Sequence, residues 1–150
     1  MYWLGIDIGT GGSRAILVDD KGQVKASFTA PHEEMRMERP LWAEQRPEDW
    51  WDAAQKAIRG VMAEGKVSGK RIKGVGLSGQ MHGLVLLDEN NAVVRPALIW
   101  CDQRSQAQCR QILDRWGDTV FEQTMNGVSP LWTWPQLLWL KQNEPEVWDG

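Results

Sequence analysis

An acidic residue placed just before a turn of small residues is the first feature of this chain that could do chemistry. Asp7 lies near the end of an apolar run, and glycines and hydroxyl residues fill positions 9–13. Backbone N–H groups and hydroxyls in such a turn can hold phosphate oxygens, while the carboxylate can face the magnesium ion that accompanies a phosphate. Glycine lets the phosphate approach the backbone closely. The segment predicts a metal–phosphate site; a tight hairpin with a solvated Asp7 is the alternative.

The turn differs from the two common glycine-rich phosphate loops. It matches neither G-x-x-x-x-G-K-[ST] nor G-x-G-x-x-G, and an apolar strand over 15–18 follows it rather than a helix. We therefore expect a strand–turn–strand hairpin in which Asp7 organises metal and phosphate. The residues expected to bind phosphate are Gly9, Thr10, Gly11, Gly12, Ser13 and Arg14.

A second polar segment, over 78–83, follows another apolar strand. Loops at the carboxyl ends of strands contact ligands in open sheets, and Gln80 and His82 offer donors and acceptors suited to hydroxyl groups. A structural histidine is the alternative for His82. His32, in a polar loop, is expected to be a surface residue.

The elements that position these segments form a mixed α/β pattern. We expect an antiparallel meander of strands over 4–8, 14–18 and 24–28, a loop from Pro31 to Pro47, and a helix that Gly65 ends. A buried strand over 72–77 follows. Further strands are expected over 84–87 and 93–94, a short apolar run over 98–100, and helices over 102–116 and 133–142.

Composition limits the function classes. The 150 residues carry 42% hydrophobic and 25% charged residues and a formal net charge of −3, which argues against nucleic acid and anionic membranes as partners. No apolar run approaches the roughly 20 residues of a membrane span. Two cysteines are too few for a disulfide framework, and the start lacks the pattern of a signal peptide, so a cytoplasmic location is expected. Ten tryptophans are mostly expected in the core, with Trp100 and Trp132 the best candidates for contacting substrate.

Several spaced blocks give the chain a specific resemblance. These are the Asp7 hairpin, the segment from Pro40 to Trp51, the block 79–83 (Gly-Gln-Met-His-Gly) with 100–104 (Trp-Cys-Asp-Gln-Arg), and the block from Gly127 to Leu140. Together they resemble the N-terminal part of FGGY-family carbohydrate kinases, and block 79–83 is most similar to the substrate loop of the xylulose-phosphorylating members. The likeness covers nearly the whole chain.

The resemblance implies a fold and a set of roles. The fold would be half of a ribonuclease-H-like protein of the actin and sugar-kinase superfamily, with a mixed sheet, an antiparallel meander and flanking helices. Residues 1–150 would be a partial N-terminal kinase domain that uses ATP and Mg²⁺, with Asp7 as the metal ligand, to phosphorylate D-xylulose. The residues implied to bind the sugar are Gln80, Met81, His82, Trp100 and Asp102.

The resemblance also implies what is missing. Relatives are several times longer, and their C-terminal half supplies the adenosine site and the aspartate that acts as general base, so no residue here is assigned that base. Gly150 follows Asp149 without a closing element, which suggests a fragment that is inactive alone and whose full-length form would be a homodimer. Leu131, Trp134 and Gln136 stand where relatives commonly have glycine, alanine and lysine, which puts fine substrate choice in doubt.

Other functions remain open at this point. A ribulose, gluconate or glycerol kinase of the same family would share most of these blocks. A non-catalytic sugar-binding or chaperone-like module could use the same fold, because fold does not fix function. A ribonuclease-H-type nuclease would need further carboxylates for two metals, and none follows Asp7 at a convincing position.

Overall fold

The computed structural model of the chain describes residues 1–148. The chain end expected at Asp149 and Gly150 lies outside the described residues. The chain divides into two compact units, which are described separately below. Unit 1 comprises Met1–Glu34 and Pro47–Gln80, and unit 2 comprises Met35–Arg46 and the residues from Met81 onward.

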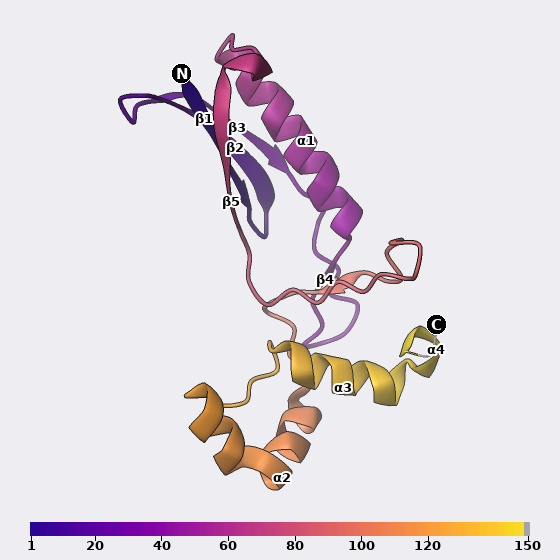
Figure 1. The fold of residues 1–150 in the computed structure, drawn as a ribbon. Helices are drawn as coiled ribbons and strands as arrows, with labels where there is room; N and C mark the ends of the chain where they lie inside the picture. The colour runs from indigo at the N-terminus through magenta and orange to yellow at the C-terminus, as the bar shows by residue number, and fades with distance from the viewer. Residues whose placement is uncertain (149–150) are drawn as a thin grey trace. The chain divides into compact units, whose positions relative to one another are not determined.

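Unit 1 is a four-stranded mixed sheet with a long helix on one face (Figure 1). Its strands are β1 (Tyr2–Ile8), β2 (Gly12–Asp19), β3 (Val24–Pro31) and β5 (Ile72–Gly79), in the spatial order β3-β2-β1-β5. β2 is antiparallel to both β1 and β3, which confirms the expected meander, and β5 is parallel to β1. The helix α1 (Pro47–Glu64) and a short 3-10 helix, η1 (Gly69–Arg71), lie between β3 and β5 in the chain.

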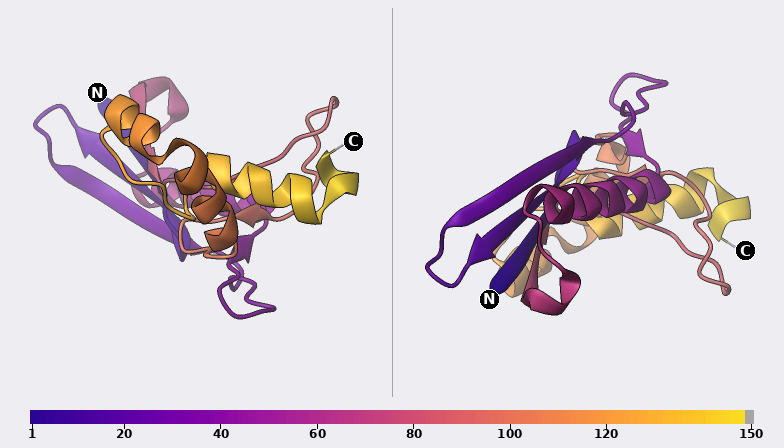
Figure 2. Two further views of the ribbon diagram at one scale, coloured as in Figure 1. Left: turned by 90° about the horizontal axis from the view of Figure 1, so that it is seen from below. Right: turned by 90° about the horizontal axis from the view of Figure 1, so that it is seen from above.

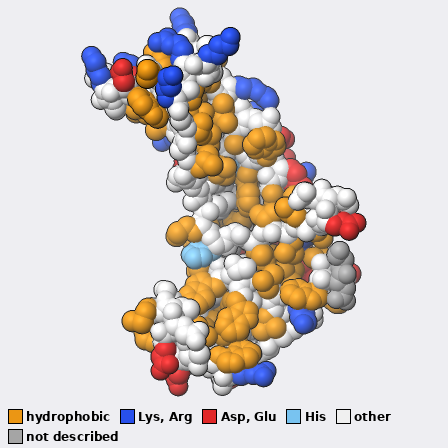
Figure 3. All heavy atoms as spheres, in the orientation of Figure 1, with side chains coloured by type: hydrophobic (Ala, Val, Ile, Leu, Met, Phe, Trp, Pro, Cys, Tyr) orange, Lys and Arg blue, Asp and Glu red, His pale blue; other side chains and the backbone are white. Residues whose placement is uncertain are grey.

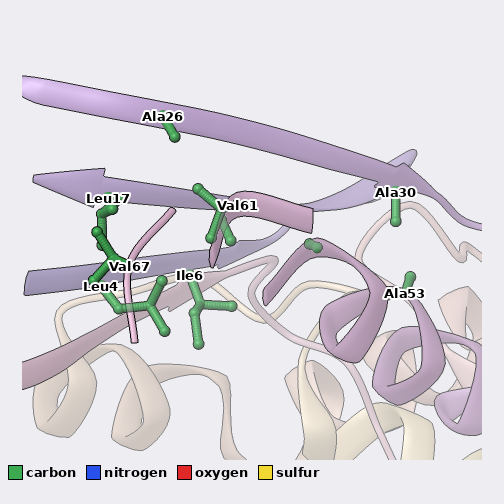
Figure 4. Close-up of a cluster of buried hydrophobic side chains, with 10 residues drawn as sticks. Leu4, Ile6, Leu17, Ala26, Ala30, Ala53, Val61 and Val67 are labelled. Atoms are coloured by element: carbon green, nitrogen blue, oxygen red, sulfur yellow. The ribbon is translucent and has the colours of Figure 1, made fainter. Parts of the chain in front are cut away.

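The core of unit 1 forms where α1 packs on the sheet (Figure 4). Pro47 opens the helix, and Glu48 and Asp49 lie in its first turn, where the helix dipole favours acids. Its buried positions carry small side chains (Ala53, Ala54, Ala57 and Val61), which lets the helix approach the sheet closely. Leu4, Ile6 and Leu17 fill the space between them.

α1 ends at Glu64, directly before Gly65, as expected. Lys66, not Gly65, has the left-handed conformation, with φ of 51°. A Cβ atom at Gly65 would lie 2.6 Å from Leu17 Cδ2 and 3.2 Å from the Val61 carbonyl oxygen, so a side chain there would force a neighbour to shift. Gly65 therefore lies where the end of α1 packs closely against Leu17 of β2.

β5 is an edge strand of the described sheet, and the prediction of a buried strand was wrong. Val75 and Leu77 expose 58% and 77% of their surface, because no other element of unit 1 covers this part of the sheet. A short apolar run in a sequence predicts a strand, but it does not reveal which other residues, if any, pack against that strand. Hydrophobic side chains accordingly reach the surface seen in Figure 3.

Unit 2 combines a small sheet with three helices (Figures 1 and 2). The sheet pairs β4 (Glu44–Gln45) with β6 (Ala97–Leu98), and the helices are α2 (Gln106–Thr124), α3 (Thr133–Asn143) and α4 (Pro145–Trp148). β4 lies inside the segment expected to be a loop. The expected strands over 84–87 and 93–94 are reduced to isolated bridges that join Leu84 to Leu98 and Leu87 to Val93.

The helix predicted over 102–116 begins later and continues further. The carboxylate of Asp102 accepts the backbone N–H of Arg104 and binds its guanidinium, which holds this segment in a turn before the helix begins at Gln106. The helix continues to Thr124 and ends at Met125, which is left-handed with φ of 54°. In the described part of the chain, no helix combines the length and apolar composition that a membrane span requires.

Candidate functional site

Asp7 lies near the carboxyl end of β1, on the face of the sheet that α1 does not cover. Strand alternation directs Leu4 and Ile6 into the α1 core and places Asp7 on the opposite face. Asp7 is exposed and is the cross-strand partner of Arg14, which is exposed as well. Both residues line a pocket of about 420 Å³ with Ser78 of β5. A carboxylate and a guanidinium are thus presented together at an open surface.

The turn after β1 is closed by a backbone hydrogen bond from Gly9 N–H to the Gly12 carbonyl oxygen, at 3.0 Å. A Cβ atom at Gly9 would come within 4.0 Å of Asp7 Oδ2, so the carboxylate lies beside the first residue of the turn. A Cβ atom at Gly12 would lie 2.7 Å from the Ala30 carbonyl oxygen, which explains the glycine there. The backbone of the turn and the Asp7 carboxylate therefore lie close together, which is the arrangement expected of a metal–phosphate site.

Ser13 is placed differently from the other residues expected to bind phosphate. Its side chain is fully buried on the α1 side of β2, and its hydroxyl lies 2.9 Å from His32 Nε2. The alternation of the strand therefore turns Ser13 away from the face that carries Asp7 and Arg14. This geometry contradicts a direct contact between the Ser13 hydroxyl and phosphate.

Gln80 joins the hairpin rather than the loop that follows it. Its backbone N–H donates to the Ile8 carbonyl oxygen at 2.8 Å, and Thr10 Oγ1 donates to Gln80 Oε1 at 3.3 Å. The parallel register that pairs Asp7 with Ser78 brings the carboxyl ends of β1 and β5 together, which causes these contacts. Gln80 was expected to bind sugar, but in this structure it forms hydrogen bonds to Ile8 and Thr10 of the hairpin.

The residues around Asp7 fit a magnesium ion that arrives with a nucleotide. Among residues 1–148 there is no cluster of three or more potential ligands of the His, Cys, Asp or Glu types. Mg²⁺ at phosphate-transfer sites is commonly held by one or two carboxylates, with phosphate oxygens and water as the other ligands. An exposed Asp7 beside the turn provides this kind of partial site.

Met81 and His82 belong to unit 2, where His82 lines a second pocket. Met81 is 70% exposed, and His82 has a left-handed backbone with φ of 56°, a conformation that histidine adopts more readily than most residues. The pocket has a volume of about 490 Å³ and is lined by His82, Asn126, Trp132, Thr133 and Trp134. Donors and two indole rings therefore surround a space large enough for a sugar.

Trp134 supplies much of the aromatic wall of this second pocket. Its side chain is 41% exposed, and its ring lies 5.5 Å from that of Trp116. Trp100, also expected near substrate, is 46% exposed but does not line the pocket. Asn126 was missed by the sequence analysis, because a lone asparagine after a helix carries no recognisable signal.

Asp102 was expected to bind sugar, but in this structure its side chain is buried away from both pockets. The side chain is fully buried, with Oδ2 accepting the Ala43 backbone N–H at 2.7 Å and binding Arg104 Nη2 at 2.7 Å. Arg104 also binds Glu44 at 2.8 Å and stacks 3.8 Å over the Trp42 ring. Asp102 is therefore a structural residue of a buried ion network.

Two further carboxylate contacts extend this network. Arg95 forms ion pairs with Glu44 and, at 3.1 Å, with Glu144. Burial raises the pKa of Glu144 above its ordinary value, although the neighbouring Arg95 and Arg104 oppose this. The network links β4 to the segments before α2 and after α3, so it holds unit 2 together.

His32 was expected to be a surface residue, and the structure shows otherwise. It is half-buried, and its ring and backbone contact three residues of the hairpin turn. The contact between His32 and Ser13 could not be predicted from sequence, because the two residues are 19 positions apart and only the pairing of β2 with β3 brings them together.

Comparisons with known proteins show which family and which structures the chain is similar to. The N-terminal domain of the FGGY family of carbohydrate kinases matches residues 2–149. The xylulose kinase of Lactococcus lactis is 42% identical over 149 residues, which cover 98% of this chain and 29% of that protein. The chain therefore spans less than a third of the length of this curated relative.

Solved structures show the same fold. A structure described as a "xyloylose kinase" from Brucella ovis is 34% identical, with a TM-score of 0.91 over 99% of this chain and 31% of the other. A gluconate kinase from Lactobacillus acidophilus is 26% identical, with a TM-score of 0.89 over 99% of this chain and 30% of its own. The expected α/β sugar-kinase fold is confirmed, and the chain belongs to the FGGY family of carbohydrate kinases.

Proposed function

We propose that this chain is the N-terminal part of an ATP-dependent kinase that phosphorylates D-xylulose in the cytoplasm. The observation that carries the proposal is the hairpin in which exposed Asp7 and Arg14 face one side while Gln80 is bonded to Thr10. The similarity to relatives named xylulose kinase supports the choice of sugar.

In this proposal the hairpin holds the charged end of the nucleotide. Asp7 would hold the Mg²⁺ that accompanies the nucleotide, and Arg14 with the backbone of Gly9, Thr10, Gly11 and Gly12 would bind phosphate oxygens. Charge neutralisation and positioning supply most of the catalysis in phosphoryl transfer. The γ-phosphoryl group leaves ADP and bonds to a sugar hydroxyl oxygen, whose proton passes to a base outside this chain.

The pocket that His82 lines is the proposed sugar site. His82 and Asn126 would bond to hydroxyl groups, and the rings of Trp132 and Trp134 would cover the C–H faces of the sugar. A second candidate within the family is a gluconate kinase, which the Lactobacillus acidophilus structure favours at 26% identity. The two differ in substrate charge, because gluconate carries a carboxylate and xylulose does not.

The test uses the chain joined to the C-terminal remainder of the Lactococcus lactis xylulose kinase, called the joined protein below. ADP release is measured with D-xylulose, D-ribulose, gluconate and glycerol, with the Asp7→Asn variant as the control. Turnover greatest with D-xylulose and lost in Asp7→Asn supports the proposal. A preference for another substrate contradicts the choice of sugar, and Mg-ATP binding without turnover on any sugar favours a non-catalytic module.

A further inference from the structure

His32 is bonded to the hairpin turn through both its ring and its backbone. Nε2 lies 2.9 Å from Ser13 Oγ, and Nδ1 lies 3.4 Å from the Thr10 carbonyl oxygen. The His32 backbone N–H donates to the Gly11 carbonyl oxygen at 3.1 Å. His32, which directly follows β3, thus contacts Thr10, Gly11 and Ser13 of the hairpin that joins β1 to β2.

These contacts indicate which nitrogen of the neutral ring carries the hydrogen. A carbonyl oxygen can only accept, so Nδ1 must carry a hydrogen to bond Thr10. In the neutral ring Nε2 is then an acceptor, and the Ser13 hydroxyl donates to it. The other acceptor near that hydroxyl, the Trp50 carbonyl oxygen, lies at 3.5 Å, so the shorter bond to His32 is favoured.

The turn is also held by the Thr10 hydroxyl, which donates to Gln80 Oε1 at 3.3 Å, whereas its tip is open. A Cβ atom built on Gly11 would meet no heavy atom within 4 Å, so the tip of the turn lies in open space. His32, in contrast, is fixed from behind, because the next backbone N–H, that of Glu33, donates to Asp49 Oδ2 at 2.7 Å. Asp49 lies in the first turn of α1, so a path of hydrogen bonds connects the rigid helix to the turn.

We propose that His32 is a positioning residue that holds the Gly9–Gly12 turn in the shape that presents its backbone to phosphate. It acts through Ser13 and Thr10 and does not touch the nucleotide. Ser13 contributes by the same route, because its buried hydroxyl anchors the ring. This inference rests on the proposed function, in which the turn binds the phosphates of ATP.

A first experiment measures the contacts without any ligand. The chain has two histidines, so selective ¹⁵N labelling gives two ring systems, and the His32→Gln variant assigns them. We expect His32 in the Nδ1–H tautomer, which is the minor form of free histidine. An Nε2–H tautomer would contradict the bond to Thr10.

A second experiment measures the turn itself by hydrogen exchange in peptides that cover residues 8–14. His32→Leu removes both ring bonds and should speed exchange about tenfold. His32→Gln can keep the bond to Ser13 and should show a smaller change, while exposed Glu34→Gln should show none. Equal exchange in His32→Leu and the wild-type chain would overturn the inference.

The link to phosphate is tested in the joined protein with Mg-ATP. We expect His32→Leu to raise the KM for ATP about tenfold, to leave the KM for sugar unchanged, and to be partly rescued in His32→Gln. Equal effects on both substrates would indicate general loss of structure and overturn the inference. Failure of the wild-type joined protein to bind Mg-ATP would instead overturn the proposed function, because the ligand-free measurements are independent of it.

Discussion

At the scale of single residues, the proposed chemistry depends on which side of a strand each side chain takes. Asp7 and Arg14 form a cross-strand pair on the open face of the sheet, whereas Ser13, one residue from Arg14, is fully buried. Polar residues that are neighbours in sequence therefore divide into two groups. One group can meet a nucleotide, and the other holds the hairpin in place.

Asp7→Asn in the joined protein should lower kcat by about 10²–10³-fold, because it removes a preorganised charge from the metal and phosphate. The KM for sugar should change little, since Asp7 lies in the hairpin and not in the pocket that His82 lines. Steady-state kinetics measure both constants. The control is Asp20→Asn, an exposed residue of the β2–β3 turn, and a normal kcat in Asp7→Asn would contradict the assignment.

His82→Ala should weaken sugar binding by roughly ten- to a hundredfold, because a lost hydrogen bond leaves a hydroxyl group unpaired. Titration of the joined protein with D-xylulose measures the affinity. His82→Asn is the matched variant, since asparagine tolerates the left-handed backbone at this position and keeps a polar group. Unchanged affinity in His82→Ala would make this a structural residue.

At the scale of elements, close packing and turn chemistry determine how the hairpin and helix α1 are held. Gly60 lets α1 lie against Phe28 of β3, and Asp19 closes the turn between β2 and β3. Neither residue can contact a ligand at the proposed site. Their substitution should therefore change the stability of unit 1 without changing the chemistry of its hairpin.

Gly60→Ala should destabilise unit 1 by roughly 1 kcal/mol. Alanine favours a helix by up to about 1 kcal/mol, but its Cβ would lie 2.4 Å from the Phe28 ring, and overpacking costs about 1–3 kcal/mol. Gly117→Ala in α2 is the control, because its Cβ would meet Leu113 at an ordinary 3.6 Å and should be stabilising. Urea unfolding measures the free energy of unfolding of both variants. A more stable Gly60→Ala variant would show that the Phe28 ring can move aside for the added methyl group.

Asp19 should make the hairpin sensitive to acid. Backbone N–H bonds from Gln23 and Lys21, with the Lys25 ammonium at 3.0 Å, lower the pKa of Asp19 to about 2. Its contribution to stability is therefore full above its ordinary pKa of 3.8 and is lost as the pH falls through about 2. Unfolding of wild type and Asp19→Asn between these values measures the difference, which should shrink toward low pH. A constant difference would contradict the assignment.

At the scale of the whole molecule, the described chain leaves apolar side chains of its four-stranded sheet exposed. β5 exposes Val75 and Leu77, and an exposed apolar patch promotes association. The chain also covers 29% of the length of its Lactococcus lactis relative. We therefore expect the chain alone to bind sugar weakly at best and to self-associate through β5.

The chain alone should show no ATP turnover dependent on D-xylulose, because phosphoryl transfer needs a nucleotide and a hydroxyl held in line beside a base. Light scattering should detect self-association that Leu77→Lys reduces. Val24→Lys is the control, because Val24 is 59% exposed on the opposite edge strand, β3. Turnover by the chain alone would mean that the catalytic base lies within it.

The sequence by itself was sufficient where local chemistry decides structure. The Asp7 hairpin, the antiparallel meander and the helix that Pro47 opens all follow from residue pattern and turn residues, and the family follows from spaced motifs. The amide and histidine of block 79–83 could likewise be singled out, although their roles stay predictions.

Only the tertiary structure decided what each polar side chain faces. Asp102 looks like a ligand in sequence, yet Ala43 and Arg104 satisfy its carboxylate inside unit 2. His32 looks like a surface residue, yet strand pairing brings it against Ser13. Residue type determines which bonds a side chain can form, but the partners come from distant segments of the chain. Their identity therefore becomes visible only when the fold brings those segments together.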